Sequence, residues 1–177
     1  MVNPIYLLPI GYNDRDALLF LQYKIQTRFA CSASILTGIE IPERAFDRDR
    51  HQYSSSEFLR QILANSPKDA IRTLGVTPVD LFIPVLTFVF GQAQLGGKAA
   101  VVSTLRLKQE YYELPPNETV FLERLGKEAV HELGHTFGLV HCRDPRCVMH
   151  LSNKIREIDI KGDSFCESCS KLLSKEL

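Results

Sequence analysis

HELGHTFGLVH, residues 131–141, is the stretch from which the fold and the chemistry of this chain can be inferred. His131 and His135 are four residues apart, so on a helix their rings project from one face and can share one metal ion. Glu132 lies beside them, where a carboxylate is better suited to act as a general base on metal-bound water than as a third ligand. The spacing predicts a helix that carries a hydrolytic zinc centre.

Gly138 and His141 complete this pattern. A glycine readily takes the left-handed conformation that ends a helix and reverses the chain, so His141 can return as a third ligand. Three protein ligands leave one position open, as in a catalytic zinc, whereas a structural zinc has four protein ligands. The alternative is a helix with surface histidines, but five fixed residues at these offsets arise by chance with a probability on the order of 10⁻⁵.

Four cysteines follow the third histidine. Cys142 and Cys147 are spaced C-x4-C, Cys166 and Cys169 are spaced C-x2-C, and 18 residues separate the pairs. Two such pairs are typical of structural zinc, and two disulfides are the alternative. The first residues lack the basic region of a secretory signal, which favours reduced thiols and zinc. Cys31 is expected to be a small buried apolar residue rather than a reactive thiol.

Met149 lies two residues after Cys147. The zinc peptidases called metzincins place a methionine-containing turn beneath their three histidines. The long histidine motif, the adjoining Cys142, Met149 and the final cysteine pair together resemble one branch of that clan, the archaemetzincins. These motifs occupy residues 131–169, under a quarter of the chain.

The resemblance implies a single α/β domain, hydrolysis of a peptide or protein substrate, and two zinc ions per chain. It implies a metallopeptidase that is often described as an aminopeptidase, with Glu132 passing the proton of the attacking water to the leaving amine. The resemblance assigns the catalytic zinc to His131, His135 and His141, and the structural zinc to Cys142, Cys147, Cys166 and Cys169.

The sequence leaves two parts of such a site unassigned. Some metzincins have a tyrosine shortly after the turn methionine that stabilises the transition state, whereas His150 and two non-aromatic residues follow here. His150 could replace the tyrosine, although a solvated or hydrogen-bonded histidine is the simpler interpretation. An aminopeptidase also needs a group that holds the free amine of the substrate. Glu40, Glu110 and Glu113 are candidates, and no motif chooses among them.

Length and charge limit the remaining possibilities. A chain of 177 residues fits one domain, residues 1–177, and can bury about two-thirds of its unfolded surface. The 21 basic and 21 acidic residues cancel, which gives no general attraction to nucleic acid or to an anionic membrane. No apolar run is long enough to span a bilayer. We therefore expect a cytoplasmic monomer that binds neither nucleic acid nor membrane.

Alternating strand and helix patterns surround the histidine motif and predict a compact, metzincin-like α/β domain. Its twisted mixed sheet would carry one antiparallel edge strand and pack against about three main helices. Strands are predicted at residues 5–10, 33–41, 81–86, 87–95 and 99–107, and helices at 14–29, 55–65, 117–138 and 164–173. Ser55 or Ser56 is the expected cap of the second helix, and Asn117 that of the third.

Two further segments have alternative interpretations. Residues 88–95 are predicted to be the antiparallel edge strand, which could bind an extended peptide by strand addition or could be an ordinary covered edge. The charged residues 42–56 have no apolar period and are predicted to be a solvated loop, with a mobile flap as the alternative. Two other functions remain open: a zinc-dependent module that binds peptides without turnover, and a nucleic-acid-binding protein that uses the four-cysteine unit.

Overall fold

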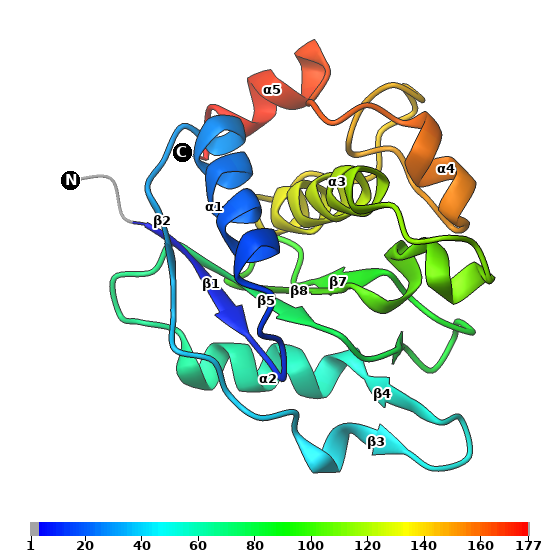
Figure 1. The fold of residues 1–177 in the computed structure, drawn as a ribbon. Helices are drawn as coiled ribbons and strands as arrows, with labels where there is room; N and C mark the ends of the chain where they lie inside the picture. The colour runs from blue at the N-terminus through cyan, green and yellow to red at the C-terminus, as the bar shows by residue number, and fades with distance from the viewer. Residues whose placement is uncertain (1–3, 177) are drawn as a thin grey trace.

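A five-stranded sheet forms the middle layer of the computed structural model, which describes residues 4–176 (Figure 1). The strand order is β2-β1-β5-β8-β7. The four strands β2, β1, β5 and β8 are parallel, and β7 pairs antiparallel with β8 at one edge, as the sequence predicted. The strands are β1 (Ile5–Pro9), β2 (Ala33–Ile35), β5 (Arg72–Thr77), β7 (Gly91–Ala93) and β8 (Ala99–Ser103).

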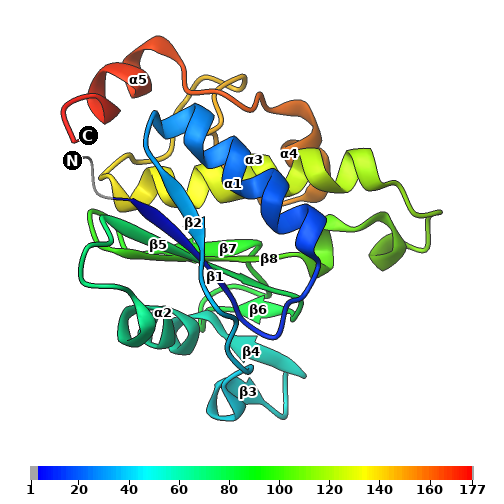
Figure 2. The same cartoon turned by 60° about the vertical axis from the view of Figure 1, so that its left-hand side comes forward.

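Helices cover both faces of this sheet. Helices α1 (Arg15–Phe29) and α3 (Glu118–Thr136) pack against each other on one face, and α2 (Ser55–Asn65) lies on the other (Figures 1 and 2). Two short helices, α4 (Ile155–Ile160) and α5 (Glu167–Leu173), follow on the side of α3. Three 3-10 turns complete the helical segments: η1 (Glu43–Ala45), η2 (Leu105–Leu107) and η3 (Gln109–Tyr112).

Side-chain caps fix where the two longest helices begin. The Asp14 carboxylate accepts a hydrogen bond from the Ala17 amide at 3.0 Å, and Asn117 Oδ1 accepts one from the Val120 amide at 3.1 Å. Such caps satisfy amides that a helix leaves unpaired and stabilise it by about 1 kcal/mol each. The predicted starts of α1 and α3 are confirmed. The cap of α2 was predicted wrongly: it is Ser54, whose side chain makes no capping hydrogen bond, and Ser55 is the first residue of the helix. The Ser55 hydroxyl donates to the Phe82 carbonyl.

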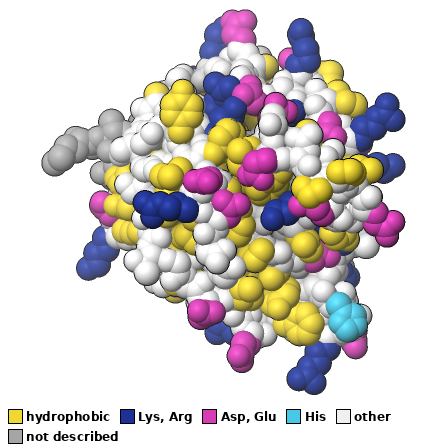
Figure 3. Space-filling model, viewed as in Figure 1, with side chains coloured by type: hydrophobic (Ala, Val, Ile, Leu, Met, Phe, Trp, Pro, Cys, Tyr) yellow, Lys and Arg dark blue, Asp and Glu magenta, His cyan; other side chains and the backbone are white. Residues whose placement is uncertain are grey.

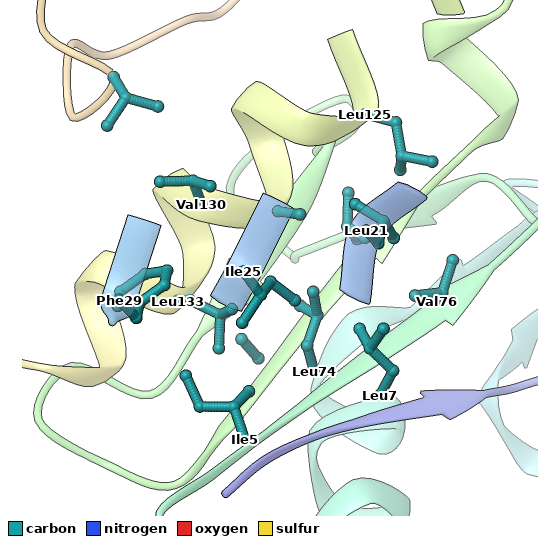
Figure 4. Packing of buried hydrophobic residues seen from close by; sticks show 14 of the residues in the cluster. Ile5, Leu7, Leu21, Ile25, Phe29, Leu74, Val76, Leu125, Val130 and Leu133 are labelled. Carbon is teal, nitrogen blue, oxygen red and sulfur yellow. The ribbon is translucent and has the colours of Figure 1, made fainter. Parts of the chain in front are cut away.

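The larger core fills the space between the sheet, α1 and α3 (Figure 4). Burying one large aliphatic or aromatic side chain contributes about 1.5–3 kcal/mol, so this layer holds α3 firmly in place. The labelled side chains, each at most 1% exposed, are Ile5, Leu7, Leu74 and Val76 from the strands, Leu21, Ile25 and Phe29 from α1, and Leu125, Val130 and Leu133 from α3.

The central strand β5 was not predicted. Its sequence, RTLGVT, combines polar residues with Gly75 and so lacks a clear strand pattern. The structure explains this glycine: a Cβ on Gly75 would lie 2.5 Å from Cδ1 of Ile62, a buried residue of α2. The close approach of α2 to the sheet therefore requires a glycine at position 75. The same glycine weakens the strand pattern in the sequence, so the strand was not predicted.

Residues 42–56 were predicted to be a loop, and this was wrong. They contain η1 and the short strands β3 (Phe46–Asp47) and β4 (Gln52–Ser54), which with β6 (Leu81–Phe82) form a second sheet in the order β3-β4-β6. The strands predicted at residues 33–41, 81–86, 87–95 and 99–107 are shorter in the structure, and Leu105–Leu107 form η2 instead of strand. Helix α4 was not predicted, and the last helix begins at Glu167.

The surface carries charges of both signs. On the face shown in Figure 3, Lys and Arg side chains are interspersed with Asp and Glu, in keeping with a formal net charge of zero. Among residues 4–176, no helix combines the length and the apolar composition needed to cross a membrane.

Candidate functional site

Backbone carbonyl groups orient two of the predicted histidines on α3. His131 Nδ1 lies 2.8 Å from the Val148 carbonyl oxygen, and His135 Nδ1 lies 2.7 Å from that of Leu139. A carbonyl oxygen accepts a hydrogen bond, so each Nδ1 carries the proton and each Nε2 keeps its lone pair. The two Nε2 atoms face each other at 3.1 Å. This arrangement suits a shared cation.

His141 joins the pair from outside the helix. Helix α3 ends at Thr136, and Gly138 has a φ of 83°, the left-handed conformation predicted for it. The reversal brings one ring nitrogen of each histidine within 4.8 Å of the others. Zinc–nitrogen bonds of about 2.0–2.1 Å in a tetrahedral site separate the nitrogens by about 3.3 Å, so small side-chain adjustments complete the site.

The electrostatic surroundings keep these three imidazoles neutral. Burial lowers the pKa of His131 well below 6.5, and it also lowers the pKa values of His135 and His141. The buried ammonium of Lys161 lowers all three further. A metal ion needs deprotonated imidazole nitrogens, so the site is prepared for a cation near neutral pH.

Glu132 lies on the same helix and is almost completely buried. A Cβ on Gly91 would lie 2.6 Å from Cγ of Glu132, so the backbone of β7 packs directly on this side chain. Burial raises the pKa of Glu132 well above 4.5, and the neighbouring Glu128 carboxylate raises it further. A carboxylate with a raised pKa is a stronger proton acceptor, which suits a general base.

The three histidines and Glu132 line one cavity of about 670 Å³. Residues 86–93 and 95 line it with mainly apolar groups, and residues 151–153 contribute a second wall. Apart from Glu132, the carboxylate among the described lining residues is Glu128, one helical turn before His131. Pockets that combine apolar walls with a few convergent polar groups are typical of ligand sites.

The four cysteines form a second cluster. Their sulfur atoms all lie within 4.8 Å of one another, and Cys142 Sγ is 3.7 Å from Cys166 Sγ. Disulfide sulfurs are bonded at about 2.05 Å, whereas zinc–sulfur bonds of about 2.3 Å place tetrahedral sulfurs about 3.8 Å apart. The Cys166 amide also donates to Cys147 Sγ. The donor set therefore fits zinc better than two disulfides.

Residues 142–150 connect the two clusters. The Cys142 amide donates to the Met149 carbonyl at 2.9 Å, and His150 Nδ1 lies 2.9 Å from the Cys142 carbonyl. Met149 is fully buried against α3, where a Cβ on Gly134 would lie 2.4 Å from its Sδ. His150 therefore has a hydrogen-bonded role in this turn, and it does not line the cavity.

Other sequence candidates are not among the residues that line the cavity. Glu40, Glu110 and Glu113 do not line it, and neither does the charged stretch 42–56. Cys31 is buried, and burial raises the pKa of its thiol, as expected of an apolar packing residue.

Sequence reasoning missed Glu128 and Lys161. Glu128 could have been found from its spacing, because positions three and four residues before His131 and Glu132 share their helix face. Lys161 gave no signal, because a lysine in a charged stretch is ordinarily exposed.

A family model described as peptidase family M54 matches residues 13–175. The chain belongs to this family. The archaemetzincin of Methanocaldococcus jannaschii is 41% identical over 98% of this chain and 94% of its own length. The crystal structure of archaemetzincin from Methanopyrus kandleri has a TM-score of 0.87 at 33% identity, covering 99% of this chain and 96% of that one. A zinc-dependent peptidase from Methanocorpusculum labreanum has a TM-score of 0.84 at 29% identity, covering 96% and 99%.

Membership of peptidase family M54 makes the protein a zinc metallopeptidase. The archaemetzincin resemblance inferred from the histidine, cysteine and methionine motifs is confirmed, and so is the mixed α/β fold. The family match and its relatives extend over almost the whole chain, well beyond residues 131–169.

Proposed function

We propose that His131, His135 and His141 hold a catalytic zinc ion and that Glu132 is the general base for hydrolysis of a peptide bond. The observation that carries this proposal is the convergence of three neutral imidazoles and one buried carboxylate on a single cavity. A zinc ion on three neutral imidazoles supplies a Lewis acid that polarises a carbonyl group and acidifies water.

Glu132 moves the proton in this reaction. Its carboxylate accepts a proton from the attacking water and then delivers it to the leaving amine. Proton transfer by a positioned side chain typically contributes about 10²–10⁴-fold to the rate. The raised pKa of Glu132 favours the first step, and the backbone of Gly91 restricts movement of its side chain.

We propose that the free edge of β7 binds the substrate as an added antiparallel strand. Gly91 packs on Glu132, and the Gly96 amide donates to the His135 carbonyl at 2.9 Å, so this segment runs along α3 from Glu132 toward His135. An antiparallel peptide would run the other way. Its residues after the cleaved bond would then lie toward Phe90 and its preceding residues toward Leu95, both of which line the cavity.

We further propose that Cys142, Cys147, Cys166 and Cys169 hold a second, structural zinc ion, so that one metallopeptidase domain, residues 1–177, contains two ions. Cys142 directly follows His141 in the chain. A closed metal site there would fix the backbone next to a catalytic ligand. The monomeric state and the cytoplasmic location remain predictions from the sequence.

An aminopeptidase would require an anionic group for the free amine of its substrate. Glu128 is placed to accept a hydrogen bond in the cavity, but its Oε1 already lies 2.7 Å from Lys161 Nζ. We therefore propose peptide-bond hydrolysis as the reaction and treat the requirement for a free amine as a result to be measured.

The test compares the zinc-loaded protein with its Glu132→Ala variant on a diverse peptide pool. Half of the peptides carry a free amino terminus and half an acetylated one, and mass spectrometry identifies the cuts. We expect the variant to keep its zinc and to lose most turnover, about 10²–10⁴-fold. Cuts confined to free-amine peptides would establish an aminopeptidase.

Glu123→Ala is the matched control, because Glu123 is exposed on the same helix. It should retain full turnover. If wild-type protein and Glu132→Ala gave the same cuts at the same rates, the assignment of Glu132 would be wrong. If neither cut any peptide while both bound peptides in a zinc-dependent way, the non-catalytic binding module would be the better description.

A further inference from the structure

Lys161 is a lysine whose side chain has no exposed surface, and it lies next to the three-histidine cluster. Its Nζ lies 2.7 Å from Glu128 Oε1, 3.4 Å from the His150 carbonyl oxygen and 3.5 Å from His131 Nδ1. These three partners come from the turn of α3 before the site, from the segment that follows Met149, and from a predicted zinc ligand. One ammonium therefore pairs with Glu128 and the His150 carbonyl, and it lies beside the Nδ1–H group of His131 without a hydrogen bond to it.

The buried pair of Lys161 and Glu128 is not explained by stability alone. Removing two charges from water costs several kcal/mol per ion, and well-packed apolar side chains of similar volume are often as stabilising as the pair. The pair is also almost fully enclosed, with side-chain exposures of 0% for Lys161 and 4% for Glu128. A specific arrangement of neighbouring groups is a reason for a chain to retain such a pair.

The backbone holds Lys161 in place independently of its side chain. Its amide donates to the Glu157 carbonyl at 3.1 Å at the end of α4, and the next amide, that of Gly162, donates to the Arg146 carbonyl at 3.0 Å. The ammonium therefore projects from a fixed point. Its fixed position therefore restricts the positions of Glu128 and the His150 carbonyl, with which it pairs.

The contacts converge on the orientation of His131. The ring of His131 is held by the hydrogen bond from Nδ1 to the Val148 carbonyl, and Val148 belongs to the same turn as His150. Lys161 joins that turn, through the His150 carbonyl, to α3, through Glu128. It thus fixes the carbonyl acceptor relative to the helix that carries the imidazole.

We infer that Lys161, paired with Glu128, is a positioning residue that sets the direction of His131 toward the metal ion. The inference rests on the proposed function only in taking the three histidines as the metal site. Groups that orient a metal ligand through a hydrogen bond commonly change metal affinity by about 10–100-fold when they are removed.

The decisive variant replaces both charges, combining Glu128→Met with Lys161→Met. Methionine is similar in length to both side chains, and the double change removes one positive and one negative charge. The net charge near the metal is therefore unchanged, and a loss of affinity reports on position. Single replacements would leave one buried charge without a partner and cost about 3–5 kcal/mol, so they are less informative.

Cobalt(II) is the probe, because its visible spectrum distinguishes a site of nitrogen ligands from a site of thiolates. We expect the double variant to unfold within a few degrees of the wild type and to bind cobalt at the three-histidine site at least about tenfold more weakly. If that double variant does not fold, Glu128→Gln combined with Lys161→Met provides the same comparison, because it also removes one positive and one negative charge.

Lys127→Met is the matched control. Lys127 also links α3 to the end of α4, since its Nζ donates to the Ile158 and Asp159 carbonyls at 3.0 and 3.1 Å, but these hydrogen bonds do not involve the turn that holds His131. Its cobalt affinity should stay within about twofold of the wild type, well below the usual effect of groups that orient a ligand. Wild-type affinity in the double variant, or an equal loss in Lys127→Met, would overturn the inference. The readout is metal binding, so it is independent of whether Glu132 proves to be the base.

Discussion

Gly134 provides the sharpest test of how the Met149 turn supports α3, the helix that carries two of the predicted metal ligands. Alanine favours a helix interior over glycine by about 1 kcal/mol, so Gly134→Ala would stabilise an isolated helix. In this protein the new Cβ would lie 2.4 Å from Met149 Sδ and 3.1 Å from its Cε. Ordinary contacts between such atoms are about 3.5–4.0 Å, so the methionine would have to move by more than about 1 Å.

The expected net effect is a destabilisation of about 2 kcal/mol. Overpacking in a filled core costs about 1–3 kcal/mol. We expect the upper part of that range, because Met149 has no exposed surface and its carbonyl is held by the Cys142 amide. Subtracting the gain of about 1 kcal/mol in helix propensity leaves the net loss. For a protein of this size, the unfolding temperature should fall by about 4–8 °C.

The assay is thermal unfolding at a fixed excess of zinc, because bound metal stabilises the folded state by mass action. Gly126→Ala in the same helix is the control: its nearest neighbour would be Phe20 Cε1 at 3.1 Å, where a slight ring movement suffices. In a Met149→Ala background the obstacle is gone, and Gly134→Ala should then stabilise by about 1 kcal/mol. Equal effects in both backgrounds, or Gly134→Ala as stable as Gly126→Ala, would refute this reasoning.

Three further predictions concern the two clusters. Gly91→Ala should displace Glu132, because the added Cβ would lie 2.6 Å from its Cγ; the Cβ would also lie 2.6 Å from the Val101 carbonyl oxygen of β8. We expect at least about tenfold slower peptide cleavage with unchanged zinc content, and cleavage at the wild-type rate would contradict this placement. Cys169→Ser should remove one zinc ion per chain, counted by elemental analysis, and lower the unfolding temperature; two retained ions would argue against the thiolate site. Zinc affinity at the three-histidine site should stay nearly constant as the pH falls to 6.5 and should decrease only below pH 6.5. Burial holds the pKa of His131 below that value. Protons compete with the metal only when the imidazoles become protonated. A chelator competition series would contradict this if affinity already fell between about pH 8 and pH 7, far above the ordinary histidine pKa.

The motifs that lie close together in the sequence were the ones that could be interpreted without a structure. His131 and His135 share a helix face because a helix repeats every 3.6 residues, and Gly138 ends that helix because its left-handed conformation disfavours a Cβ. Asn117 and Asp14 mark helix starts for equally local reasons. Metal-ligand spacing and helix capping depend on a few neighbouring residues, so both can be predicted from the sequence alone.

Other features depend on residues far apart in the chain, and no local pattern specifies them. The strand β5 was hidden by Gly75, which is explained only by the approach of Ile62. The predicted loop at residues 42–56 forms strands because β4 pairs with β6, about 28 residues further along. Lys161 is 30 residues from His131 in sequence and 3.5 Å from it in space.

The sequence by itself determined which residues are the candidate metal ligands, which carboxylate accompanies them and which family the chain resembles, because these properties follow from spacing along a helix and within a short loop. The tertiary structure alone decided which carbonyl groups orient the histidines, which edge strand packs on Glu132, and that a buried ion pair lies behind the site. Those contacts arise when separate segments pack together, and the free energy of packing depends on the shape of the whole fold rather than on any one segment.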